Sequence, residues 1–223
     1  MCTLVTIAQA HPVPKGYTRV YLCRHGETNY NLQGRFQGRG IDSELNENGI
    51  AQAQALGNAL KNIPLRAIFS SKLSRAKATA AKISQYHPNT SIGVIDGIEE
   101  MGYGDNEGKY LAQSKHLLKD VIDRWNEGNF DIAWPQGESA RDVEKRGTTA
   151  LLQLLKDHPT YEQIALVCHG RFNRVLLSSV LYQDLRKMED IEQDNTCVNI
   201  LDFDHATETF HALVLNNTDH RIT

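Results

Sequence analysis

The sequence predicts an α/β fold, a three-layer sandwich in which a mostly parallel sheet carries helices on both faces. Two observations predict it. Short apolar runs of strand length alternate with longer segments whose apolar residues recur every three or four positions. Single strands that alternate with helices are typical of a parallel sheet covered on both faces. Neither a linker nor a repeat interrupts the 223 residues, so we expect one domain over residues 18–223 behind an extended N-terminal tail of residues 1–17.

The elements are expected in the following order. Residues 1–17 hold Pro12 and Pro14 and show no periodicity, which favours an extended lead-in. Asn46 and Ser139 are typical N-cap residues and begin helices. The expected strands cover residues 19–23, 65–69, 91–95 and 164–168, followed by β segments at 197–203 and 209–215. The expected helices cover residues 46–60, 73–86, 109–125, 139–156 and 172–182, and residues 29–40 form a loop.

The composition excludes several classes of protein. A formal net charge of −3 argues against a nucleic-acid-binding protein, which usually carries a surplus of basic residues. No apolar run approaches the roughly 18 residues of a membrane span, and the N-terminus lacks the basic leader of a signal peptide. The cysteines are too scattered for a disulfide framework or a metal site, which predicts free thiols in a reducing compartment, the cytoplasm. They are Cys2, Cys23, Cys168 and Cys197.

Two of the expected strands end in the same way. The strand at 19–23 is followed by Arg24-His25-Gly26, and the strand at 164–168 is followed by His169-Gly170. Open α/β sheets bind their ligands at the carboxyl ends of the strands. If the two strands are neighbours, both imidazoles therefore meet at one edge of the sheet. Gly26 allows the backbone a sharp turn or a close approach to a ligand.

A helix start and a loop supply further groups. Arg75 lies in the first turn of the helix at 73–86, where a cation opposes the helix dipole at a cost of a few tenths to about 1 kcal/mol. The same place suits an anion, which a forked guanidinium holds well; the alternative is a solvated arginine. The acidic, glycine-rich loop at 96–108 supplies Glu99 and Glu100. Two arginines, two histidines and a carboxylic acid suit phosphate-ester chemistry without a metal.

Four motifs stand in order along the chain. They are Leu22-Cys23-Arg24-His25-Gly26-Glu27-Thr28 with Asn31, then Ser70-Ser71 with Arg75, then Ile98-Glu99-Glu100 with Tyr103-Gly104 and Glu107-Gly108, and finally Val167-Cys168-His169-Gly170. With these motifs the chain, from residue 18 to residue 220, resembles the histidine phosphatase superfamily, in the branch of the cofactor-dependent phosphoglycerate mutases and their phosphatase relatives. The resemblance implies a phosphoglycerate mutase-like fold and neither a bound cofactor nor a metal.

The resemblance also implies roles for individual residues. His25 would be the nucleophile that becomes phosphohistidine. Glu100 would be the proton donor and base, because it stands three positions before the aromatic residue that precedes Gly104. Glu99 is its rival, and the alternative for Glu99 is a solvated loop acid. The residues that would surround the phosphate are Arg24, Arg75, Asn31 and His169. The residues assigned to substrate binding are Gln37, Gly38, Gly170 and Arg171. A neutral, attacking His25 needs a partner for the proton on its other ring nitrogen, and a backbone carbonyl of its own turn is a candidate.

Four local patterns favour a phosphatase over a mutase. Residues 35–38 carry Gln before Gly, as phosphatases of the family often do, where mutases usually carry Thr-Gly followed by Trp. Residues 104–108 resemble the phosphatase pattern Gly-x-x-Glu-Gly. The connection at 134–139 lacks the longer proline-rich insertion of mutases, and residues 216–220 are similar to the Asn-x-Thr-x-His pattern of small phosphatases. We therefore expect a metal-independent phosphatase, with a cofactor-dependent phosphoglycerate mutase as the alternative.

Arginines near the motifs bear on the substrate. Cations close to the pocket of a chain with net charge −3 would focus an anionic substrate; the alternative for each is a solvated surface side chain. They are Arg35, Arg39, Arg171 and Arg174. Arg171 stands where related phosphatases usually carry a small or apolar residue. We expect a small phosphorylated metabolite with a second acidic group, and sugar bisphosphates, phosphoglycerate and phosphoserine all fit.

Two further classes of function stay open. Residues 168–174 satisfy Cys-x5-Arg, the spacing of cysteine-dependent phosphatases, with Cys168 as the attacking thiolate. The match is poor, because no histidine precedes this cysteine and Arg171 replaces the expected glycine. A phosphate-binding regulator would use the same pocket without turnover. Nucleic acids and membranes are not expected partners, and assembly into a homodimer stays open.

Overall fold

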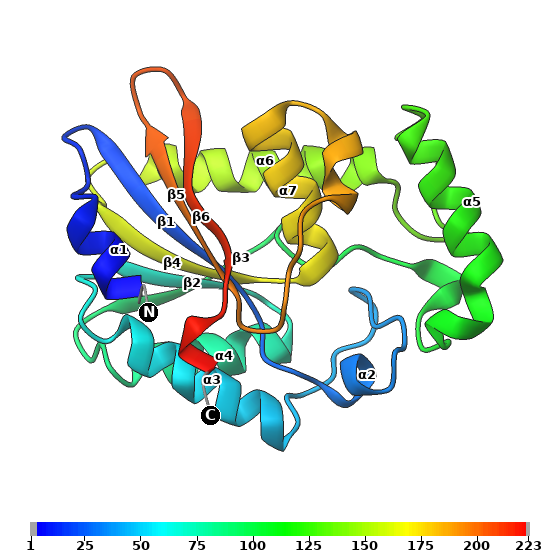
Figure 1. Cartoon of the computed structure of the whole chain (residues 1–223), viewed down its shortest axis with the longest axis horizontal. Coiled ribbons are helices and arrows are strands. Elements are labelled where there is room, and N and C mark those ends of the chain that lie inside the picture. Colours follow the sequence, from blue (N-terminus) through cyan, green and yellow to red (C-terminus); the bar gives the residue numbers. More distant parts are fainter. Residues whose placement is uncertain (1–3, 222–223) are drawn as a thin grey trace.

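A computed structural model describes residues 4–221 of the chain (Figure 1). Its centre is a six-stranded sheet with the order β3-β2-β4-β1-β5-β6. The strands are β1 (Tyr17–Arg24), β2 (Ala67–Ser71), β3 (Ser91–Ile95), β4 (Gln163–Cys168), β5 (Val198–Asp204) and β6 (Thr209–Asn217). The pairs β1–β4, β4–β2 and β2–β3 are parallel, and β5 pairs antiparallel with both β1 and β6. The predicted, mostly parallel sheet is confirmed.

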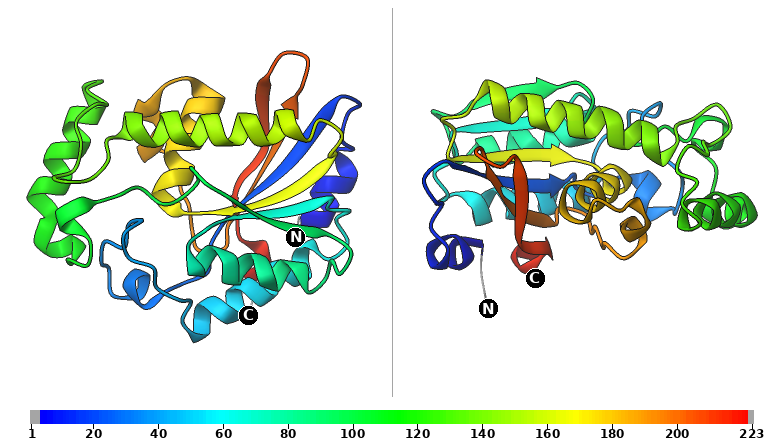
Figure 2. Two further views of the ribbon diagram at one scale, coloured as in Figure 1. Left: turned by 180° about the vertical axis from the view of Figure 1, so that it is seen from behind. Right: turned by 90° about the horizontal axis from the view of Figure 1, so that it is seen from above.

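Helices cover both faces of the sheet, which completes the predicted three-layer sandwich (Figures 1 and 2). They are α1 (Leu4–Ala10), α2 (Asn29–Leu32), α3 (Glu47–Leu60), α4 (Ser74–Ser84), α5 (Lys115–Asn126), α6 (Ala140–Asp157) and α7 (Gly170–Tyr182). The side chains of β1 alternate between the layers. Val20 and Leu22 pack in a cluster with α6 and α7, whereas Tyr21 and Cys23 pack with α3 and α4. The central strand is therefore buried on both faces.

The register between β1 and β4 brings the two histidine motifs together. Arg24 lies opposite Cys168, and the backbone N–H of His25 donates to the Cys168 carbonyl at 3.1 Å. The pairing thus continues one residue beyond the end of β1. His25 and His169 consequently leave neighbouring strands at the same edge of the sheet, as the sequence predicts.

Helix starts agree with the predicted caps. The side chain of Asn46 accepts a hydrogen bond from the Gly49 N–H at 2.8 Å and begins α3. Ser139 accepts from the Asp142 N–H at 3.1 Å and begins α6. Each cap satisfies a backbone donor that a helix start would leave unpaired.

The loop expected at 29–40 contains one helical turn, α2. Thr28 caps this turn, and Asn31 donates and accepts reciprocal bonds with Thr28 in a capping box. The helix expected at 109–125 also differs, because residues 111–114 form a 3-10 turn and α5 begins only at Lys115.

The extended tail expected at residues 1–17 is wrong in its first part, because Leu4–Ala10 form helix α1. Leu4 is 2% exposed and packs in the same cluster as Leu56 of α3. Burial of this apolar face stabilises the helix. Pro12 lies beyond the end of the helix, where it removes no helical hydrogen bond. Residues 1–3 lie outside the described part of the chain, and the division into tail and single domain stays a prediction.

The sequence also predicts the absence of a membrane span and the presence of free cysteines. Between residues 4 and 221 no helix is both long enough and apolar enough to cross a membrane. Cys23, Cys168 and Cys197 are free and buried, whereas Cys2 lies outside the described residues.

Candidate active site

His25 follows the last residue of β1, and its own turn fixes its ring. The Nδ1 atom lies 2.7 Å from the carbonyl oxygen of Gly26. Because a carbonyl oxygen only accepts, Nδ1 must carry the proton, and Nε2 keeps a free lone pair. The expected backbone partner is therefore confirmed. A Cβ at position 26 would lie 2.4 Å from the Gly49 carbonyl oxygen, so only glycine lets the start of α3 pack against this turn.

His169 follows β4 and lies beside His25. The two ring centroids are 5.2 Å apart, and the ring planes are inclined by 57°. Both imidazoles are buried. Burial, and then the charge of Arg75, lowers the pKa of each imidazole well below its ordinary value of 6.5. Both rings are therefore neutral at pH 7, which is the state that a nucleophile requires.

Arg75 reaches the same place from the first turn of α4. Its side chain is completely buried, which excludes the solvated alternative. It donates to the carbonyl oxygens of Gly38 at 2.8 Å and Ile41 at 2.9 Å. Burial lowers the pKa of Arg75 to about 10, so that the guanidinium is still charged at neutral pH. A buried cation held only by neutral oxygens is prepared for an anion.

Several buried nitrogen atoms near His25 have no hydrogen-bond partner among the described residues. They are Nε of Arg24, Nε of Arg75 and both ring nitrogens of His169. Arg24 is itself oriented by a hydrogen bond to the Gln193 carbonyl oxygen at 2.6 Å. Leaving a buried polar group unpaired costs about 1–3 kcal/mol. Such a cluster next to two guanidinium groups indicates a site for the oxygen atoms of an anion.

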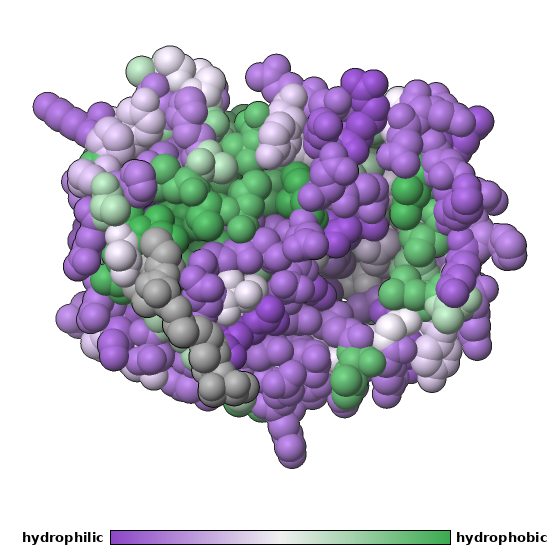
Figure 3. Space-filling model, viewed as in Figure 1, coloured by the Kyte–Doolittle hydropathy of each residue, from purple (hydrophilic) through white to green (hydrophobic). Residues whose placement is uncertain are grey.

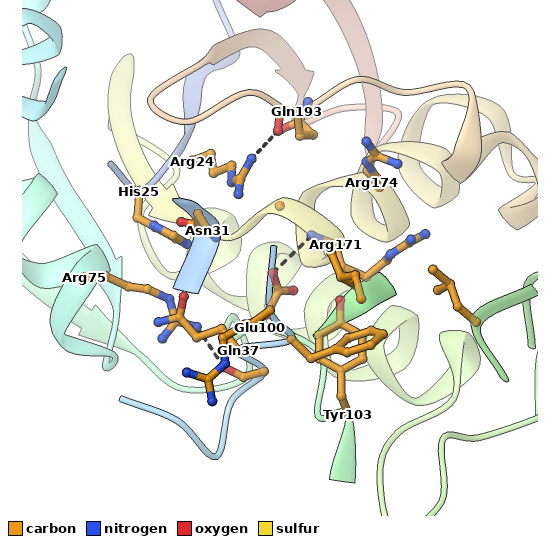
Figure 4. Close-up of a pocket in the computed structure, with 16 residues that line it drawn as sticks. Arg24, His25, Asn31, Gln37, Arg75, Glu100, Tyr103, Arg171, Arg174 and Gln193 are labelled. Carbon is orange, nitrogen blue, oxygen red and sulfur yellow. Dashed lines mark hydrogen bonds between the residues drawn. The ribbon is translucent and has the colours of Figure 1, made fainter. Parts of the chain in front are cut away.

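Glu100 is held in place by backbone N–H groups. Its Oε1 accepts from Phe172 at 2.8 Å and from Met101 at 2.9 Å, and its Oε2 accepts from Arg171 at 3.2 Å. Two of these donors belong to the first turn of α7, directly after His169. The carboxyl group therefore stands between the phosphate-binding residues and the rest of the cavity (Figure 4).

Glu99 points to a different environment. Its side chain is 1% exposed and pairs with Lys72 at 3.0 Å, Arg39 at 3.6 Å and Arg146 at 3.7 Å. Burial opposes its ionisation, but hydrogen bonds and these cations outweigh burial and lower the pKa of Glu99. The interpretation of Glu99 as a solvated loop acid is wrong. It is a buried ion-pair partner that does not line the cavity.

A cavity of about 310 Å³ opens beside His25. Figure 3 shows the hollow between the body of the molecule and α5, with apolar side chains along its α5 border. The wall residues that the sequence predicts are Arg24, His25, Asn31, Gln37, Gly38, Arg75, Glu100, Gly170 and Arg171. His169 is not among the residues that line the cavity; it lies beside His25 without exposed surface, and both of its ring nitrogens lack a partner among the described residues.

Different local contacts place the residues that are assigned to substrate binding. Asn31 accepts from the Thr28 N–H at 3.2 Å through its amide oxygen, which leaves its NH₂ group as a donor. The Gln37 amide oxygen accepts from the Thr28 hydroxyl at 2.9 Å, and the side chain is buried at the wall. At Gly170 a Cβ would lie 3.1 Å from the Nε of Arg24. Glycine there lets Arg24 lie directly against the start of α7.

Some wall residues were not predicted as site residues. They are Phe36, Tyr103, Leu111, Leu118 and Gln193. Tyr103 could have been identified, because it belongs to one of the four sequence motifs. The two leucines show only the general apolar pattern of a helix, and the sequence around Gln193 contains no motif that indicates a site. Of the four flanking arginines, Arg39 lies away from the wall in its pairs with Glu99 and Glu138, whereas the other three line it.

Cys168 does not fit the role of a nucleophile. It has no exposed surface, and burial raises the pKa of its thiol well above the ordinary value. The geometry therefore argues against a cysteine-dependent phosphatase and directs attention to the imidazole of His25.

Comparisons with known proteins find one matching family and several relatives of known name. The model of the histidine phosphatase superfamily (branch 1) matches residues 20–218. A putative phosphoserine phosphatase 2 of Hydrogenobacter thermophilus is 32% identical over 177 residues, which are 79% of this chain and 85% of that protein. The fructose-2,6-bisphosphatase TIGAR of Xenopus tropicalis is 41% identical over 128 residues, which are 56% of this chain and 45% of that protein.

A solved structure has the same fold. The phosphoserine phosphatase of Entamoeba histolytica, crystallised as a mutant in complex with phosphoserine, superposes with a TM-score of 0.80 at 27% identity. The superposition covers 92% of this chain and all of the other. The likeness in fold therefore extends over most of the chain.

Proposed function

This chain belongs to the histidine phosphatase superfamily and is a phosphatase, and we propose that it hydrolyses small phosphate monoesters through a phosphohistidine formed on His25. One observation carries the proposal. The hydrogen bond from His25 Nδ1 to the Gly26 carbonyl leaves Nε2 unprotonated inside a buried, cationic pocket. An imidazole in this state is a competent nucleophile.

In the first step, the Nε2 lone pair of His25 attacks the phosphorus atom and the bond from phosphorus to the ester oxygen breaks. Arg24 and Arg75 neutralise the charge that gathers on the equatorial oxygen atoms. The carboxyl group of Glu100 gives a proton to the leaving oxygen, which departs as an alcohol. His169 and Asn31 supply further hydrogen bonds to the phosphoryl group.

In the second step, Glu100 acts as a base. Its carboxylate takes a proton from water, the water oxygen attacks phosphorus, and the phosphorus–nitrogen bond of phosphohistidine breaks. Inorganic phosphate leaves, and His25 returns to its neutral form with the proton still on Nδ1. Each step uses only side chains that border the cavity or, for His169, contact the ring of His25.

The substrate proposed is a small phosphorylated metabolite rather than a macromolecule. The cavity of about 310 Å³ suits a compact ligand. The relatives named above act, by their names, on phosphoserine and on fructose 2,6-bisphosphate, which are both small. We also propose the cytoplasm as the compartment, because the described cysteines are buried free thiols. A homodimer stays a prediction.

Turnover of p-nitrophenyl phosphate in excess EDTA tests the proposed function. The expected result is phosphate release that neither EDTA nor added Mg²⁺ changes, because arginines supply the positive charge. Release that depends on a divalent metal, or no release at all, contradicts the proposal. 3-Phosphoglycerate with 2,3-bisphosphoglycerate then separates the alternatives, since a mutase forms 2-phosphoglycerate whereas a phosphatase releases inorganic phosphate.

A further inference from the structure

The cavity has a second cationic end. Arg171 and Arg174 lie three positions apart on α7, on one face of the helix. Both line the cavity. Figure 4 shows them on the far side of Glu100 from His25 and Arg75. This distal end therefore faces the part of a ligand that the phosphate-binding residues do not hold.

Positive charge exceeds negative charge at the distal end. Arg171 and Arg174 share one carboxylate, that of Glu189, to which Arg171 donates directly and from which Arg174 lies 3.6 Å away. Burial and the charge of Arg171 lower the pKa of Arg174. Two guanidinium groups crowded around one carboxylate leave a cation without a partner of its own.

Arg35 adds a third guanidinium to the wall. Its hydrogen-bond partners are neutral, namely the Gly108 carbonyl oxygen at 2.6 Å and Gln33 at 3.3 Å. Its guanidinium carbon also lies over the rings of Tyr30 and Tyr110 at 4.7 and 5.2 Å. The excess of positive charge on the wall therefore extends beyond α7.

Apolar side chains also line the cavity. Tyr103, Leu111 and Leu118 line the cavity with these arginines. Leu111 is 39% exposed although it is a large hydrophobic residue. A wall that combines apolar side chains with separated cationic ends fits a ligand whose charged groups are joined by carbon.

We propose that Arg171 and Arg174 form a subsite for a second anionic group, a carboxylate or a phosphate, on the carbon skeleton of the substrate. The preferred substrates are then phosphate monoesters that carry another anion at a distance from the ester. This inference rests on the proposed function in one respect, since it takes the ester phosphate to lie at His25. A guanidinium fork binds either anion.

Substrate pairs that differ only in the second charge test the subsite. The pairs are ethyl phosphate and phosphoglycolate, propyl phosphate and 3-phosphooxypropanoate, and butyl phosphate and 4-phosphooxybutanoate, each with the corresponding terminal bisphosphate. For the wild-type protein we expect kcat/KM to favour the doubly anionic member about 10- to 100-fold at the best length. The carboxylate and the bisphosphate of that length show which anion the subsite prefers.

The variants Arg174→Gln and Arg171→Gln should lower that preference ratio about tenfold each. Arg186→Gln is the matched control, because Arg186 is an exposed arginine paired with Asp184 away from the cavity. It should keep the wild-type ratio. Equal rates for charged and uncharged members at every length, or an unchanged ratio in both subsite variants, would overturn the proposal.

Binding separates the subsite from the catalytic proposal. Calorimetric titration of the same pairs into the His25→Ala protein, checked for folding by circular dichroism, measures the preference without turnover. A preference that disappears on adding Arg174→Gln supports the subsite even if wild-type protein hydrolyses nothing, in which case only the proposed function fails. No difference in affinity between charged and uncharged members contradicts the subsite, even if hydrolysis proceeds.

Discussion

The two ends of the cavity are built in different ways. At the phosphate end, His25 and His169 extend from adjacent strands and Arg75 from a helix start, and all three are buried. Backbone carbonyl oxygens orient His25 and Arg75. At the distal end, Arg171 and Arg174 are partly exposed and are oriented by one glutamate side chain, Glu189.

The difference separates chemistry from substrate choice. Groups held by the sheet edge and by backbone oxygens keep one geometry, as preorganised catalysis requires. The distal arginines are held by a side chain and lie under α5 and the 3-10 turn at 111–114. They can therefore be substituted without disturbing the sheet edge that carries the catalytic groups. We therefore expect variants of the phosphate end to lose rate for every substrate, and variants of the distal end to alter selection among substrates.

Arg75→Met should give the largest loss among the variants that spare the nucleophile. Removal of the buried guanidinium takes away a transition-state cation and leaves the carbonyl oxygens of Gly38 and Ile41 without a donor. We expect kcat/KM to fall about 10³–10⁵-fold for p-nitrophenyl phosphate and propyl phosphate alike. The exposed Arg66→Met provides the control. A loss confined to doubly anionic substrates would contradict the assignment of Arg75 to the phosphate end of the cavity.

Glu100→Gln should come next, with a loss of about 10²–10⁴-fold in kcat for alkyl phosphates. The amide keeps the shape of the side chain but can neither give nor take the proton. A leaving group that needs no proton should rescue the first step, so formation of the phosphoenzyme from p-nitrophenyl phosphate should suffer far less. Equal losses for both kinds of leaving group would contradict the role of Glu100, and exposed Glu44→Gln is the control.

Arg146 holds the segment that carries Glu100. It donates to the carbonyl oxygens of Gly97, Glu99 and Glu100 at 2.8–3.0 Å and forms two bonds with Glu138. We expect Arg146→Met to lower kcat about 10- to 100-fold through misplacement of the carboxyl group.

The dependence on leaving group distinguishes this positioning role from a general loss of structure. The deficit of Arg146→Met should shrink for p-nitrophenyl phosphate in the phosphoenzyme-forming step, as for Glu100→Gln. Arg141→Met, exposed on the same helix, should behave as wild type. A uniform deficit for all leaving groups would assign Arg146 to stability alone.

Acid should lower the stability of the folded protein through the two buried histidines of the phosphate end. The folded-state pKa values of His25 and His169 lie well below 6.5 because of burial and Arg75. The unfolded chain therefore binds more protons as the pH falls below about 6.5, so that stability present above this pH is lost progressively. The melting temperature should fall between pH 7 and pH 5, by about 2–4 °C for each kcal/mol lost.

Replacing both histidines with glutamine should flatten that decline. The catalytic counterpart is a rate that stays high below pH 6.5, because His25 keeps its lone pair there. Part of the decline should remain in the double variant, because burial also lowers the pKa of His87 and that of His220 to about 4. A melting temperature that does not change between pH 7 and pH 5, or a decline of undiminished size in the double variant, would contradict neutral burial of His25 and His169.

Much of the phosphate end could be predicted from the sequence, because local patterns determine it. Two apolar strands followed by His-Gly fix where His25 and His169 emerge, and a parallel sheet brings such ends together. The N-caps at Asn46 and Ser139 follow from side-chain chemistry alone. The burial of Arg75 could be suspected from its unfavourable place against a helix dipole.

The remainder depends on contacts between distant segments. Glu189 pairs with Arg171 only after the chain beyond α7 folds back, and no local sequence pattern predicts that ion pair. Glu99 looks like an exposed loop acid until Arg146 of α6 reaches it. Helix α1 is stabilised because Leu4 packs against apolar residues of α3. The periodicity of a seven-residue segment cannot predict this tertiary contact.

Capture of the phosphoenzyme tests the nucleophilic role of His25 directly. Protein mixed with ³²P-labelled phosphate monoester is quenched in alkali, where phosphohistidine survives, and the label is assigned by peptide mass spectrometry. We expect a label on the peptide that contains His25, absent from His25→Ala and retained by Cys168→Ser. Label at normal rate in His25→Ala, or on Cys168, would contradict it.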